Sequence, residues 1–82
     1  MSPEQCRAAR AWLGWTQQEL ARRAGVGLST VRDFEKGERT PIANNLMAIR
    51  RAIEEAGIRL LFREDGEPSG ITTEESRTSA SA

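Results

Sequence analysis

The chain has 82 residues, of which 38% are hydrophobic and 29% are charged, and its twelve Lys/Arg balance twelve Asp/Glu. This length predicts one domain with a small core. No apolar run approaches the roughly 20 residues that cross a membrane, and the N-terminus does not resemble a secretory signal. With no histidine and with Cys6 as its single cysteine, the sequence excludes an intrachain disulfide, argues against a Cys/His metal site and disfavours acid–base catalysis. We therefore expect a cytoplasmic protein that is not an enzyme and that needs no cofactor or metal.

The zero net charge hides an uneven distribution along the chain. Residues 1–63 hold eleven Lys/Arg against seven Asp/Glu, a net charge of +4, whereas residues 64–82 hold one arginine against five acids, a net charge of −4. We interpret residues 1–63 as the folded domain. We interpret residues 64–82 as an acidic, Ser/Thr-rich tail that is disordered apart from a short strand near 70–72.

The first predicted helix begins with a capping box and ends at a glycine. In Ser2-Pro3-Glu4-Gln5 a capping serine precedes a proline at the first helical position, and a glutamine follows three residues after the serine. Gly14 is placed to end the helix. Residues at helical spacing predict its buried face: Cys6, Ala9 and Leu13. Trp12 is interpreted as a further core residue.

The second predicted helix repeats the same starting signal. Thr16 and Glu19 have the spacing of a capping box, and Trp15 and Leu20 occupy the two positions of a hydrophobic staple. This helix is short and is expected to end at Ala24, because a glycine follows.

Two further helices follow. The third is predicted from Leu28 to Lys36, with Val31 and Phe34 turned inward, and the fourth begins after Thr40-Pro41. An apolar stripe at helical spacing predicts the buried face of the fourth helix: Ile42, Leu46, Ile49, Ile53 and Ala56.

The residues after the fourth helix change character. Residues 58–62, with the sequence Ile-Arg-Leu-Leu-Phe, are predicted to form a strand, which cannot be stable alone. Its partner is either Gly70-Ile71-Thr72, folded back across Asp65-Gly66, or the same strand of a second chain.

The stretch from Gln17 to Lys36 meets the steric demands of two helices that cross closely. Ala21 supplies a small side chain for the crossing, and Gly25 tolerates the positive φ of a tight turn. Apolar residues occupy every position that must face the core: Leu20, Ala24, Val26, Val31 and Phe34.

This stretch resembles the helix-turn-helix of the lambda-repressor-like (Xre/Cro) family. The resemblance covers roughly residues 3–57; residues 15–21 (Trp-Thr-Gln-Gln-Glu-Leu-Ala) match the family's opening of the second helix, and residues 35–41 match its Glu-x-Gly-x-x-x-Pro exit. It implies a mostly α fold of four short helices followed by a short strand or hairpin. It also implies a sequence-specific regulator that binds double-stranded DNA and lies in the nucleoid. One departure is Gly27, where the family often has a capping serine, and this costs a few tenths of a kcal/mol.

The resemblance also implies roles for individual residues. Base edges would face Leu28, Ser29, Arg32 and Asp33, whereas phosphates would contact Gln17, Gln18, Thr30, Lys36 and Arg39. For Arg32 and Asp33 the alternative is an exposed, salt-bridged helix face. Arg10 and Glu35 match positions that form a partly buried ion pair in some relatives.

One such module makes few contacts with DNA, so we expect a homodimer on a palindromic operator, acting as a repressor. The predicted dimer interface is the apolar strand, with Ile58, Leu60, Leu61 and Phe62. The alternative function is that of an antitoxin or another protein-interaction module, in which the C-terminal segment binds a protein partner.

Overall fold

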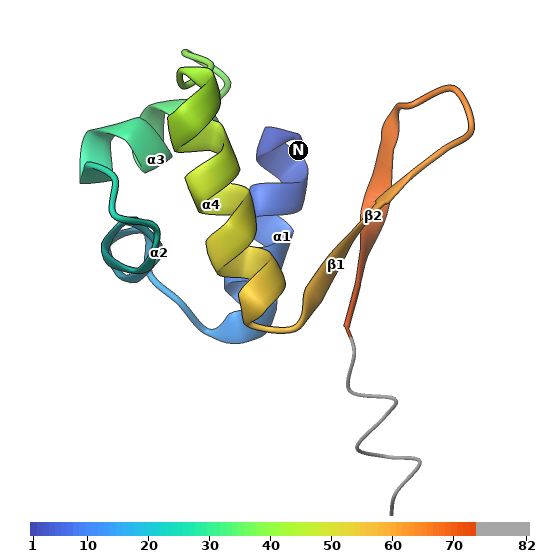
Figure 1. Ribbon diagram of the computed structural model, residues 1–82, viewed down its shortest axis with the longest axis horizontal. Helices are drawn as coiled ribbons and strands as arrows, with labels where there is room; N and C mark the ends of the chain where they lie inside the picture. Colours follow the sequence, from blue (N-terminus) through green and yellow to red (C-terminus); the bar gives the residue numbers. More distant parts are fainter. Residues whose placement is uncertain (74–82) are drawn as a thin grey trace, which may run out of the picture.

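The structure is a computed structural model that describes residues 1–73, and the expected disorder of residues 74–82 lies outside this range. Four helices precede an antiparallel hairpin: α1 (Pro3–Leu13), α2 (Gln17–Ala24), α3 (Leu28–Glu35), α4 (Ala43–Glu55), β1 (Ile58–Phe62) and β2 (Pro68–Thr73). Figure 1 shows α2 and α3 at one end of the long axis and the hairpin at the other. The predicted mostly α fold of four short helices and a hairpin is confirmed.

The two predicted capping boxes have different outcomes. At α1 the Ser2 hydroxyl accepts from the Gln5 backbone N–H, and the Gln5 side chain accepts from the Ser2 backbone N–H, so this box is complete. At α2 the Thr16 hydroxyl accepts from the Glu19 backbone N–H. The predicted return bond from the Glu19 carboxylate is wrong, because this exposed carboxylate binds two arginines of its own helix instead. A charge-assisted bond is stronger than one to a neutral amide.

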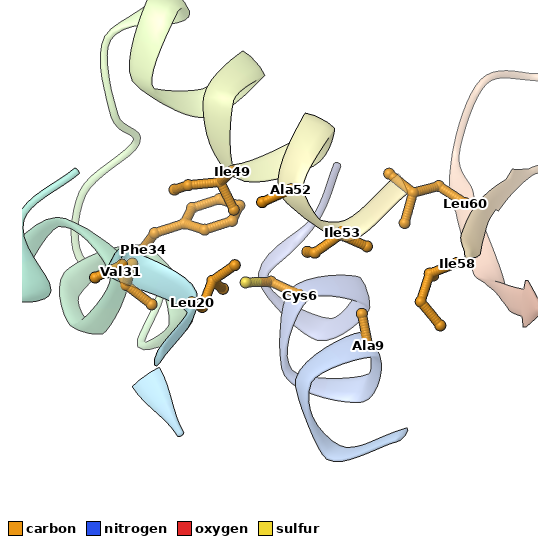
Figure 2. Packing of buried hydrophobic residues seen from close by; sticks show 11 residues of the cluster. Cys6, Ala9, Leu20, Val31, Phe34, Ile49, Ala52, Ile53, Ile58 and Leu60 are labelled. Atoms are coloured by element: carbon orange, nitrogen blue, oxygen red, sulfur yellow. The ribbon is translucent and has the colours of Figure 1, made fainter. Parts of the chain in front are cut away.

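The core lies between all four helices and the first strand (Figure 2). Its eleven buried residues come from every one of these elements: Cys6, Ala9, Leu20, Ala21, Val31, Phe34, Ile49, Ala52, Ile53, Ile58 and Leu60. The inward positions predicted for Val31 and Phe34 are confirmed, as is the centre of the α4 stripe at Ile49 and Ile53. Burying each of these four side chains contributes on the order of 2 kcal/mol to the stability of the fold.

Three apolar residues that were predicted to be buried are exposed. Trp12 is 60% exposed, and its prediction as a core residue is wrong because its side chain faces solvent and not the core. Ile42 is 70% exposed, because α4 begins one residue later and Ile42 serves as its N-cap. At the other end of the stripe Ala56 lies beyond the last helical residue and is also exposed.

The hairpin is formed within the chain and packs back on the helices. β1 pairs with β2 so that Leu60 lies opposite Ile71. A turn joins the strands, in which the Arg63 backbone N–H donates to the Glu67 oxygen and the Gly66 backbone N–H donates to the Arg63 oxygen. Of the two partners that the sequence left open, the intrachain one near 70–72 is formed, and it is longer than predicted. Ser69 has no residue opposite it, which makes a bulge in β2.

Gln5 connects the hairpin to the helical body. Its side-chain amide donates to the backbone oxygens of Leu61 at 2.8 Å and Gly70 at 3.0 Å, one in each strand, next to the bulge. The same amide oxygen accepts from Ser2 in the capping box. Gln5 is 2% exposed, so its donors and its acceptor are satisfied inside the protein.

Candidate nucleic-acid interface

The crossing of α2 and α3 has the geometry that the sequence predicts. Gly25 adopts a φ of 71°, in the left-handed region that favours glycine, and ends α2. The Val26 backbone N–H then donates to the Ala21 oxygen at 3.0 Å, which turns the chain sharply into α3. Ala21 is 4% exposed, and a larger side chain there would separate the two helices.

The outer face of α3 carries the residues that were expected to face bases. Leu28, Ser29 and Arg32 are exposed, and Asp33 is half-buried. Gly27 begins the helix without a side-chain cap, as its sequence departure predicts. An exposed leucine among polar residues leaves an apolar spot on an otherwise hydrophilic helix face.

A shallow cleft runs beside this face and brings part of the predicted site together. It has a volume of about 230 Å³, and α3 and the segment leading into α4 line it: Ser29, Thr30, Asp33, Arg39, Thr40, Pro41, Ile42 and Asn45. Two predicted base contacts, Ser29 and Asp33, thus share one surface with two predicted phosphate contacts, Thr30 and Arg39. Leu28, Arg32, Lys36 and Gln18 do not line the cleft.

The cleft also contains polar residues that sequence reasoning missed. Thr40 and Asn45 line it, and both stand where the chain enters α4. The available signal was the polar pair Asn44-Asn45 in the first turn of a helix whose start had been predicted correctly to within one residue. A larger cleft of about 500 Å³ lies at the other end of the molecule, between α1 and β2.

Several basic side chains are already bound to carboxylates of the same helix. Glu19 accepts from Arg22 and Arg23, each at 2.6 Å, and these hydrogen bonds hold the pKa of Glu19 below its ordinary range. On α4 Arg50 binds Glu54 at 2.9 Å. Such exposed pairs contribute little to stability, but they reduce the positive charge that each arginine offers to a ligand.

The cations on and beside α3 are not paired in this way. Among residues 1–73, Arg32, Lys36 and Arg39 make no ion pair with a carboxylate within 4.0 Å, and Arg51 of α4 shares this property. The alternative of a salt-bridged face is therefore not formed, because neither Arg32 nor Asp33 makes an ion pair among the described residues. All three cations near α3 are exposed and available to an anionic ligand.

A buried carboxylate at the end of α3 joins three helices. Glu35 has a side chain only 2% exposed, and Arg10 binds it through two hydrogen bonds of 2.8 Å, which confirms the expected ion pair. Gln17 donates to the same carboxylate at 3.0 Å and Cys6 at 3.2 Å. Burial alone would raise the pKa of Glu35, but the hydrogen bonds from Arg10, Gln17 and Cys6 outweigh it and lower the pKa. Burial and the neighbouring carboxylate raise the pKa of the Cys6 thiol, so the thiol stays protonated.

The two glutamines at the start of α2 differ in their surroundings. Gln17 is half-buried, and one N–H of its amide is held by Glu35, so its second N–H and its oxygen remain for other partners. Gln18 is exposed. The sequence analysis gave both as phosphate contacts and missed the link between Gln17 and Glu35.

Other classes of site find no support in the part of the chain that is described. Residues 1–73 contain no cluster of three or more His, Cys, Asp or Glu with the spacing of a metal site. Within the same residues, no helix has the length and apolar character required to span a membrane.

Comparison with known families identifies the arrangement. A family model described as helix-turn-helix matches residues 7–59, which is more than half of the chain and includes α2, the turn and α3. A search of the curated proteins found no match. The predicted resemblance is confirmed. The chain belongs to the lambda-repressor-like (Xre/Cro) helix-turn-helix family, whose members are DNA-binding regulators.

Proposed function

We propose that this protein is a dimeric transcriptional repressor that inserts α3 into the major groove of a palindromic operator. The observation that carries the proposal is the distribution of free cations. Arg32, Lys36 and Arg39 are exposed and unpaired within the described residues on and beside α3, whereas the arginines of α2 are bound to Glu19. Neutralising phosphates with free Lys and Arg is the main source of affinity for DNA.

Sequence is proposed to be read by the exposed face of α3. Arg32 donates to guanine O6 and N7, and Asp33 accepts from cytosine N4. Leu28 contacts a thymine methyl, which gives a reason for an apolar side chain that is 38% exposed beside polar neighbours. Ser29 lines the cleft next to Asp33 and forms a hydrogen bond to a base of either kind.

Phosphates are proposed to be bound on both sides of this face. Arg39 lines the cleft with Thr30, and Lys36 caps the end of α3, so each of these residues is placed to contact the DNA backbone. Gln17 and Gln18 begin α2, where backbone N–H groups and the helix dipole favour an anion. These contacts position the domain without reading sequence.

Dimerisation is proposed to use the hairpin. Of the four residues predicted for the interface, Ile58 and Leu60 pack into the core of their own chain at 2% and 7% exposure. Leu61 and Phe62 remain exposed at 38% and 40%. Within residues 1–73 the sheet has two strands, so each strand has one edge without a ladder partner. Such an edge, with two apolar side chains beside it, suits pairing with a second copy.

The hairpin lies at the opposite end of the molecule from α3 (Figure 1). A two-fold axis at the hairpin leaves both α3 helices free to face DNA. Two α3 helices reach successive major grooves when they lie about 34 Å apart, which corresponds to half-sites about 10 base pairs apart.

Sedimentation and gel-shift experiments on matched variants test this proposal. Replacing Leu61 and Phe62 together by serine should produce monomers and weaken binding to a full palindrome, while binding to an isolated half-site stays unchanged. Trp12→Ser is the control, because it also removes an exposed apolar side chain but outside the hairpin. A wild-type protein that sediments as a monomer at high micromolar concentration would contradict the dimer.

A second candidate function is that of an antitoxin, and the net charge of −4 over residues 64–82 favours it. An acidic segment of this kind suits a basic protein partner. Co-purification of the product of a neighbouring gene with the full chain, but not with a chain ending at residue 73, would support this function.

A further inference from the structure

Four donors converge on the Glu35 carboxylate, and one of them belongs to the proposed DNA-binding surface. Oε2 accepts from Arg10 Nε at 2.8 Å and from Cys6 Sγ at 3.2 Å. Oε1 accepts from Arg10 Nη2 at 2.8 Å and from Gln17 Nε2 at 3.0 Å. Two oxygens have about four acceptor sites, so this carboxylate is fully used.

The same cluster fixes the backbone that leads to Gln17. Arg10 Nη1 donates to the Trp15 backbone oxygen at 2.9 Å, two residues before Gln17. Glu35 thus holds the Gln17 side chain directly and holds the preceding turn through Arg10. A glutamine on a helix surface otherwise samples several rotamers, and this freedom is lost when it binds a ligand.

We propose that Glu35 is a positioning residue for DNA binding, and that it orients the amide of Gln17 before DNA arrives. The proposal rests on the proposed function, in which Gln17 contacts a phosphate. Glu35 takes one N–H of the amide and leaves the second N–H to donate to a phosphate oxygen. Glu35 itself touches no DNA, because its side chain is buried.

Stability and positioning must be separated, because removing Glu35 alone leaves Arg10 without its partner. Replacing both members of a buried ion pair by apolar residues of similar size is often neutral for stability. We therefore choose Arg10→Met/Glu35→Leu as the variant that removes the carboxylate while it keeps the fold. Urea denaturation checks this first.

A double-mutant cycle with Gln17→Ala then tests the positioning role. With Gln17 present, Arg10→Met/Glu35→Leu should weaken binding to a selected operator by about three- to tenfold, the equivalent of one lost hydrogen bond. In the Gln17→Ala background the same double substitution should change affinity less than about twofold. An equal loss in both backgrounds would overturn the proposal, because it would show a general effect on the fold.

A measurement without DNA keeps the two proposals distinguishable. In a ¹⁵N–¹H spectrum of the free wild-type protein, the Gln17 side-chain proton that is bound to Glu35 should lie downfield of the usual glutamine range and exchange slowly with solvent, and Arg10→Met/Glu35→Leu should remove both properties. If the variant loses these properties but the wild-type protein binds no DNA, the Glu35–Gln17 contact is retained and its role in DNA binding is rejected. Gln17 amide protons with the shifts and solvent exchange of a solvated glutamine in the wild type would overturn the inference, even if the protein binds DNA well or Arg10→Met/Glu35→Leu fails to fold.

Discussion

Replacing Gln5 by glutamate tests what holds the hairpin against the helical body. Gln5 completes the α1 capping box with its amide oxygen, and its amide nitrogen donates to Leu61 in β1 and Gly70 in β2. Glutamate keeps an acceptor for the Ser2 backbone N–H. It loses both donors and turns a carboxylate toward two carbonyl oxygens.

The expected cost follows from these contacts. Each of the two lost hydrogen bonds contributes about 1 kcal/mol, and the carboxylate would occupy a site where the glutamine is 2% exposed. We expect Gln5→Glu to lower the free energy of unfolding by about 2 to 4 kcal/mol. Ser2→Ala removes the serine cap and keeps both bonds to the hairpin, so it should cost about 1 kcal/mol.

Urea denaturation followed by circular dichroism measures both variants. Hydrogen exchange at the hairpin then shows whether the loss is local, because freeing the hairpin should raise exchange in β1 and β2 before α2 and α3. If Gln5→Glu costs no more than Ser2→Ala, the hairpin is held by its apolar side chains alone and the reasoning from Gln5 is wrong.

Three further predictions concern the α2–α3 unit. Arg32→Ala should cost about 1 to 3 kcal/mol of binding free energy and relax the base preference at one base pair, whereas Lys36→Ala should weaken binding to all DNA sequences alike. Binding assays on operator variants compare the two. Leu20→Ala, at a fully buried position, should cost about 2 to 5 kcal/mol of stability in urea denaturation, and a cost below 1 would show that the core closes over the cavity. The lowered pKa of Glu35 stabilises the fold above the ordinary glutamate pKa, and this contribution is lost as pH falls through the lower folded value. The Glu35→Gln variant should therefore lose less stability than the wild type between pH 5 and pH 2, roughly the acid range of carboxylates. Equal slopes of melting temperature against pH for the two proteins would refute this.

The sequence predicted those features that depend on local signals. Ser2 and Thr16 cap the first two helices, and Gly14 and Gly25 end them in the left-handed conformation, as expected from residues within one turn. The strand at 58–62 followed from composition, and a turn signal offered the partner near 70–72 as one of two alternatives. Such contacts span few residues, so a single sequence contains the information.

Features that depend on which element covers which face were not predictable in this way. Trp12 is exposed although it is large and apolar, and composition alone does not show that its side chain faces solvent. Gln5 lies 56 residues from Leu61 in the sequence, and the pattern showed it only as part of a cap. One signal was present, because Gln5 stands beside Cys6 on the helix face that also contains Ala9.

The same distinction between local signals and tertiary packing applies to the candidate site. The outer face of α3 followed from helical spacing once Val31 and Phe34 were placed inside. To predict the part of the cleft formed by Thr40 and Asn45, the path of the loop between α3 and α4 must be known. The link from Gln17 to Glu35 required the angle between α2 and α3, which spacing alone does not give.

In-vitro selection of the purified full chain on random duplex DNA at physiological salt measures whether α3 recognises a specific DNA sequence. We expect an inverted repeat whose half-sites lie about 10 base pairs apart, with binding that weakens steeply as salt rises. Recovery of no motif by a protein that is folded would contradict sequence-specific recognition by α3.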